Sequence, residues 1–147
     1  MIRLFLVLVL LLSGIQSALA CSRDPSLPEL TDEDLFRAAS AVFHGRIYKT
    51  EEALDAIGPD GKPMPIVVGT FHLKEVFKGR PPEDRMVRGP TPGPGNCGLP
   101  LMVGLDYVFF LTEESGPFVL WTNGSRAYFN LDAAEPKQFL EKLRALK

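Results

Sequence analysis

The sequence predicts a single mainly β domain: a small, closed or nearly closed barrel of five strands, with a short helix on its N-terminal side and a helix at its C-terminal end. The chain of 147 residues is long enough for one core and too short for two full domains. Apolar segments with a two-residue period recur along it, and helical spacing occurs near both ends. Five strands suit a barrel better than an immunoglobulin-type sandwich, which has about seven.

The first 20 residues predict an export signal. Arg3 precedes an unbroken apolar run, residues 4–12, and Ala18 and Ala20 supply the small side chains of a signal-peptidase site before Cys21. The run is far shorter than the roughly 20 apolar residues of a membrane-spanning helix, and no second run of that kind follows. We expect a signal peptide at 1–20 and a mature domain at 21–147 that is secreted, periplasmic or in the cell envelope, with no transmembrane segment.

Two processing routes compete for Cys21. Ordinary cleavage after Ala20 leaves a free α-amine on this cysteine. The lipoprotein route would instead acylate Cys21, although Ala18 and Leu19 stand in the reverse of the order that this route prefers. The sequence favours the soluble product and leaves a lipid anchor on Cys21 as the alternative.

The two cysteines predict one disulfide. An exported chain meets an oxidising compartment, where an even number of cysteines is most simply paired, and Cys21–Cys97 is the single possible pair. The loop closed by this bridge spans 76 residues of sequence. The chain-entropy model gives about 4 kcal/mol of stabilisation for a loop of this size.

The first half of the mature chain predicts one helix and two strands. Thr31 is an N-cap followed by three acidic residues, which predicts a helix from Asp32 to about Ser40. Period-2 alternation predicts a strand over 41–48 and a longer one over 66–77, with a bulge near Lys74 and Glu75. The polar residues 49–65 between them predict a hairpin loop.

The second half predicts three short strands and a helix. The three predicted strands are 84–88, 105–111 and 118–122. The second is apolar on both faces and is therefore expected to be central in the sheet. Residues 89–100 contain four Pro and four Gly and predict no regular structure. Asp132 is the expected N-cap of a helix through Leu146, whose apolar stripe should pack on the barrel.

The chemistry available in the sequence disfavours an enzyme. A net charge of −2 gives no basic excess for a nucleic-acid partner. His44 and His72 lack the clustered third ligand of a zinc site, so structural or surface roles are favoured over metal binding. A cysteine nucleophile would require a free thiol, which the expected bridge removes. The acid pairs at 32–34 and 51–52 are better explained by helix capping and a solvated loop. We expect no catalytic residues and no cofactor of the protein's own.

Several segments together resemble the netrin-like domain, and within it the tissue inhibitors of metalloproteinases and their small bacterial relatives. The resemblance lies in the order and spacing of these segments over most of the mature chain. They are Cys21-Ser22 at the cleavage point, Val42-Phe-His-Gly-Arg-Ile47, Phe71-His-Leu-Lys-Glu-Val-Phe-Lys-Gly79, Asn96-Cys-Gly-Leu99 and Gly104-Leu-Asp-Tyr-Val-Phe-Phe-Leu111.

The resemblance implies a five-stranded OB-type barrel in which the first cysteine pairs with the cysteine of a Cys-Gly step, here Cys97. The cysteine count predicts the same bridge independently. The family pattern usually has a second cysteine two residues after the first, bridged to one shortly after the last barrel strand. Arg23 and, approximately, Gly124 occupy those places here, so the second bridge is missing as a unit.

The resemblance also implies a binding function. In the animal inhibitors the α-amine and carbonyl of the first cysteine chelate the zinc of the target peptidase, and the next side chain enters its specificity pocket. Carried over, these residues are Cys21 and Ser22, and Asn96, Cys97 and Gly98 complete what we call the inhibitory edge. The expected partner is a zinc metallopeptidase. The alternative is a cell-envelope lipoprotein or interaction module that binds another protein or a glycan without inhibiting a protease.

Overall fold

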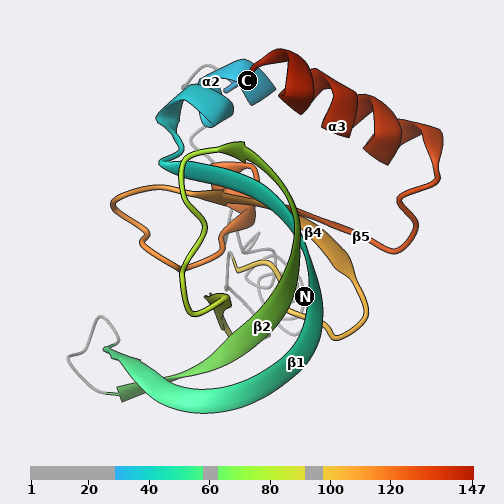
Figure 1. The fold of residues 1–147 in the computed structure, drawn as a ribbon. Coiled ribbons are helices and arrows are strands. Elements are labelled where there is room, and N and C mark those ends of the chain that lie inside the picture. Colours follow the sequence, from blue (N-terminus) through green and yellow to red (C-terminus); the bar gives the residue numbers. More distant parts are fainter. Residues whose placement is uncertain (1–28, 58–62, 92–97) are drawn as a thin grey trace, which may run out of the picture.

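The computed structural model describes residues 29–57, 63–91 and 98–147, and these form one antiparallel sheet of five strands with two helices (Figure 1). The predicted mainly β class, with a helix near each end of the mature chain, is confirmed. The predicted signal peptide, 1–20, lies outside the described residues. Within those residues no helix has the length and apolarity needed to cross a membrane.

The sheet is a Greek key. Its strands are β1 (Ala41–Ile57), β2 (Pro63–Lys78), β3 (Met86–Pro90), β4 (Asp106–Leu111) and β5 (Arg126–Tyr128). The first three form a meander and β4 returns to pair with β1, which gives the order β3-β2-β1-β4-β5.

The sheet is strongly curved but its strands do not close into a complete barrel within the described residues. The edge strand β3 meets the segment that follows β4 through two backbone hydrogen bonds. Arg88 donates its N–H to the carbonyl of Pro117 at 2.9 Å and accepts from the N–H of Val119 at 2.7 Å. The edge of β3 that faces away from β2 is therefore bonded to irregular chain and not to another strand.

The predicted hairpin loop 49–65 is wrong over most of its length. β1 continues to Ile57 and β2 begins at Pro63, with pairing along the whole hairpin. The polar residues stand on a strand that solvent reaches, so they lack the apolar alternation of a half-buried strand. The predicted bulge is confirmed: Glu75 pairs with His44 and Leu73 pairs with Gly45, which leaves Lys74 as the extra residue on β2.

Two later strands also differ from their predictions. The segment 118–122 makes two isolated bridges, from Phe118 and Leu120, and then a 3₁₀ turn over Trp121–Asn123. The last strand is instead Arg126–Tyr128, which pairs with the start of β4. β3 begins at Met86 instead of at residue 84.

Both helices pack on one face of the sheet. α2 (Asp32–Ala38) has the predicted Thr31 cap, as a capping box in which Thr31 and Asp34 each accept the other's backbone N–H. α3 (Ala134–Ala145) begins at an Ala133 cap with no side-chain hydrogen bond, so the predicted Asp132 cap is wrong. The predicted apolar stripe is buried against the sheet.

Two apolar clusters cover opposite faces of β1 and β4. One lies between the sheet and the helices and contains Val42, Val108, Phe110, Phe139 and Leu143, among others. The other fills the inside of the curve and contains Phe43, Ile47, Phe71, Tyr107 and Phe109, among others. The central strand β4 is buried on both faces, as predicted.

Candidate functional site

Gly98 is the one residue of the predicted inhibitory edge that the structure describes. Cys21, Ser22, Asn96 and Cys97 lie outside the described residues, and so does the bridge predicted between the two cysteines. The surroundings of the edge can be built from the residues that flank it on both sides, which are Glu29 and Leu30 after the N-terminal segment and Gly98 to Met102 after Cys97.

Gly98 lies in a position that only glycine can occupy without displacement. It bridges to Leu120 and packs against Pro90 at the end of β3. A Cβ atom added at Gly98 would lie 1.9 Å from Cγ of Pro90, well inside any real contact. The residue directly after Cys97 is therefore held tightly between β3 and the 117–120 segment.

The chain after Gly98 is fastened to the core by Tyr107. The Tyr107 hydroxyl donates to the carbonyl of Pro100 at 2.7 Å and accepts from the N–H of Met102 at 2.8 Å. Burial raises the pKa of Tyr107, and the hydrogen bond from Met102 partly opposes that rise. The phenol stays neutral at ordinary pH and keeps the proton that it donates. Leu101 adds a buried apolar anchor between the two hydrogen bonds.

The chain before α2 meets the other side of the same region. Glu29 and Leu30 line a cavity with Thr122 and Gly124, only a few residues along from the Leu120 that bridges to Gly98. Ion pairs hold this neighbourhood together, since Asp32 at the start of α2 contacts both Arg126 of β5 and Lys142 of α3. The described residues nearest to the two cysteines thus converge on the 120–124 segment.

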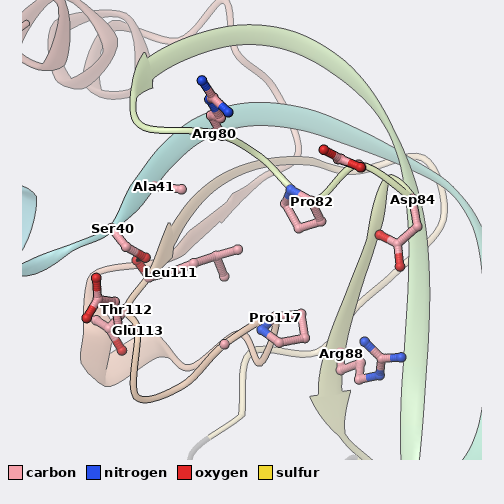
Figure 2. Close-up of a pocket in the computed structure, with 12 residues that line it drawn as sticks. Ser40, Ala41, Arg80, Pro82, Asp84, Arg88, Leu111, Thr112, Glu113 and Pro117 are labelled. Carbon is pink, nitrogen blue, oxygen red and sulfur yellow. Dashed lines mark hydrogen bonds between the residues drawn. The ribbon is translucent and has the colours of Figure 1, made fainter.

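A second feature is an open depression of about 510 Å³ at the end of the sheet where β1 begins (Figure 2). Its apolar floor comes from β1, the end of β4 and two prolines, and charged side chains stand around it. The lining residues are Ser40, Ala41, Arg80, Pro82, Glu83, Asp84, Arg88, Leu111, Thr112, Glu113, Gly116 and Pro117. Figure 2 shows that they come from three segments far apart in the sequence.

The loop beside this depression contains the one described non-glycine residue with positive φ. Arg85 has φ 58°, in the left-handed region that costs most side chains energy. Its carbonyl accepts from the N–H of Phe71, its N–H donates to Pro82, and the neighbouring Asp84 carboxylate accepts from the N–H of Met86. These bonds hold the loop that forms one wall. The charges around the depression are of both signs, so they select no ligand class.

Both histidines have protein partners. His44 is buried on β1 with Nε2 2.9 Å from Oδ1 of Asp106, whose other oxygen lies 3.5 Å from Nη1 of Arg46. His72 lies on the surface and its ring stacks on that of Tyr48, with centroids 4.1 Å apart. In the part of the chain that the structure describes, no three His, Cys, Asp or Glu side chains are grouped so as to hold a metal ion.

Neither the depression nor the role of Tyr107 is predicted by the sequence. The depression could have been found from strand order, because β2 and β4 both run antiparallel to β1 and therefore both end where β1 begins. The partners of Tyr107 are main-chain atoms of a turn, which leave no signal in the residue types. Comparisons with protein-family models and with curated proteins give no match to this chain.

Proposed function

We propose that this protein is an exported, non-enzymatic binding module that inhibits a zinc metallopeptidase through its mature N-terminus. The α-amine and carbonyl of Cys21 would chelate the target's zinc, and Ser22 would enter the adjacent pocket. The resemblance to the netrin-like domain supports this, as does the Greek-key order of the five strands, since the OB fold is a partly open Greek-key barrel of five strands.

The convergence of chain around residues 120–124 is the observation that carries the proposal. Gly98, next to Cys97, bridges to Leu120, and Glu29 lines a cavity with Thr122. The eight residues from Cys21 to Glu29 can span up to about 27 Å when extended. This length of chain and the convergence on residues 120–124 support a Cys21–Cys97 bridge, which would fix the N-terminus to a part of the fold that Tyr107 and Pro90 hold in place.

The chemistry of such an N-terminus suits a catalytic zinc. A catalytic zinc keeps an open coordination position, and an amine with the neighbouring carbonyl forms a bidentate chelate. An α-amine has a pKa of about 8, so it can lose its proton to a metal near neutral pH. The inhibitor brings no metal of its own and uses no side chain as a catalyst.

The test compares the protein beginning at Cys21 with a variant that carries one extra alanine before Cys21. The native form should inhibit at least one member of a panel of zinc peptidases. The extended form should lose inhibition, because the amine moves away from the carbonyl of Cys21. A Glu114→Gln variant, exposed and outside the inhibitory edge, keeps both the chelate and Ser22 and serves as the matched control. Equal inhibition by the native and extended forms, or none by either, would reject chelation.

The intact mass of the exported protein separates this proposal from the lipoprotein alternative. A product that begins at Cys21, carries no lipid and is two hydrogens lighter than the dithiol has both the bridge and the free amine. Acyl chains on Cys21 would block the amine, exclude chelation and identify a membrane-tethered interaction module instead.

A further inference from the structure

The β1–β2 hairpin extends beyond the rest of the sheet, and one side of its β1 strand has no strand partner among the residues that the structure describes. β4 pairs with β1 over residues 41–46, and Ile47 closes this ladder by bonding to Leu105 and Gly104. From Tyr48 onward, the described part of β1 pairs with β2 alone. Figure 1 shows the two strands curving together toward a common tip, away from both helices. We call residues 48–54 the free edge of β1.

Exposed apolar side chains gather at this free edge. Six large apolar side chains are exposed in the described part of the chain, and four of them lie on the free edge or on the loop that ends it. They are Tyr48, Leu54, Met102 and Val103, with exposed fractions of 48%, 71%, 50% and 57%. Unpaired strand edges flanked by apolar side chains are sites of strand addition. The loop 102–104 is placed beside the edge by the hydrogen bond from Gly104 to Ile47.

The charges on the free edge are self-complementary. Lys49 and Glu51 project on the same face because they are two residues apart on a strand, and within the chain they form an ion pair of 2.6 Å. A twofold axis through Thr50, perpendicular to the sheet, would place Lys49 of each copy opposite Glu51 of the other. Shifting the register by two residues would instead oppose Lys49 with Lys49 or Glu51 with Glu51. The charge pattern therefore favours one register and opposes its neighbours.

We propose that a second copy of this chain pairs with the free edge, antiparallel and with Thr50 opposite Thr50, so that one continuous sheet crosses the dimer. In this register Glu52 lies opposite Tyr48 of the second copy. Beyond Glu52, the chain up to Leu54 lies beside the loop of Met102 and Val103 in the second copy. That loop marks the end of the second copy's free edge. The pairing thus accounts for the exposure of Leu54 and of that loop together. It is independent of the proposed inhibition.

The test uses charge-exchanged variants of the full chain, produced with its own N-terminal leader, in sedimentation analysis over a wide concentration range. Wild type should dimerise as concentration rises. Lys49→Glu and Glu51→Lys each place like charges opposite one another twice per dimer, so dissociation should become roughly tenfold easier or more. An equimolar mixture of the two variants restores opposite charges and should form heterodimers. The double variant Lys49→Glu with Glu51→Lys should form homodimers again.

The matched control is Glu113→Lys, an exchange at an exposed turn outside the free edge, which should leave dimerisation unchanged. Circular dichroism melting of each variant checks that the fold is intact. A wild type that stays monomeric at every concentration overturns the proposal. Dimers of Lys49→Glu as stable as those of wild type, or a mixture of the two single variants that forms no heterodimer, overturn it as well.

Discussion

Arg144 of α3 and Glu75 of β2 form a bidentate ion pair that connects the C-terminal helix to the sheet. Nε of Arg144 donates to Oε1 of Glu75 at 2.9 Å, and Nη2 donates to Oε2 at 2.7 Å. Parallel hydrogen bonds of this kind are the strong form of a surface ion pair. The hydrogen bond from Arg144 lowers the pKa of the Glu75 carboxyl, and partial burial opposes this.

Replacing Glu75 by Gln should destabilise the protein modestly and in a pH-dependent way. The loss near pH 7 should be about 0.5–1 kcal/mol, because both side chains are partly exposed. The pKa of Glu75 is lower in the folded than in the unfolded state, so its contribution is complete above the unfolded value of 4.5 and disappears as the pH falls through the folded value. Urea denaturation of both proteins should therefore converge in acid. Glu114→Gln is the control, and an equal gap at every pH would contradict the assignment.

Gly98→Ala should cost about 1–3 kcal/mol, because the new methyl group overlaps the ring of Pro90. Thermal melting measures the loss. Adding Pro90→Ala removes the overlapping Cγ and Cδ atoms and should recover part of the stability. If the losses of stability of the two single variants simply add up in the double variant, the added methyl group does not clash with Pro90.

Tyr107→Phe and Tyr128→Phe should differ in sign or in size, although both rings are buried. Tyr107→Phe leaves the Pro100 carbonyl and the Met102 N–H without their partner and should cost about 1–3 kcal/mol. The hydroxyl of Tyr128 is buried without a hydrogen-bond partner among the described residues, so Tyr128→Phe should be neutral or stabilising. Chemical denaturation of the two variants checks this, and equal losses would refute it.

Alkaline pH should unfold the protein by ionising these two phenols. Burial raises the pKa of Tyr107 and of Tyr128, the latter against the opposing charge of Arg126. Stability from a raised pKa is complete below the unfolded value of 10.0 and falls as the pH rises through the folded value. In a Tyr48→Phe variant, which keeps only these two phenols, phenolate absorbance should therefore rise together with loss of the far-ultraviolet signal. Ionisation of both phenols without unfolding would contradict the burial argument.

Cys97→Ser should lower the melting temperature if Cys21 and Cys97 are bridged, with a loss of about 4 kcal/mol in the chain-entropy model. Cys21→Ser should have a similar effect, and the double variant should be no worse than either single one, since one bond is lost in each case. Melting curves that do not change would remove the bridge, and with it the argument for a fixed N-terminus.

The sequence predicts those elements whose burial is one-sided or complete. β4 was predicted from a run of apolar residues on both faces, and α2 from Thr31 and the acidic turn after it, because these signals are local. The distal half of β1 was missed because a strand in a solvated ribbon carries polar residues on both faces and resembles a loop. The cap of α3 was misplaced because Asp132 pairs with Lys137 through its side chain, and Asn130 accepts its backbone N–H.

Residues 118–122 show why apolar composition alone does not define a strand. The segment is apolar like a buried strand, and its Val119 is fully buried in the inner cluster. Its backbone, however, bonds to the edge of β3 at a single residue, Arg88, before the chain turns. The partners of this segment are set by the curvature of the whole sheet, as are those of Gly98. Neither can be derived from neighbouring residues in the sequence.

The two apolar clusters share their supporting strands, and this determines how the molecule opens. Val42 and Phe43 are neighbours in the chain but belong to different clusters. The same is true of Val108 and Phe109. Loss of either cluster removes the packing from one face of β1 and β4 and leaves the other cluster without its wall. Such a molecule has no half-folded intermediate in which only one cluster survives. The amides of β4 should therefore exchange with solvent deuterium only through global unfolding, with one common free energy of opening for residues on either face.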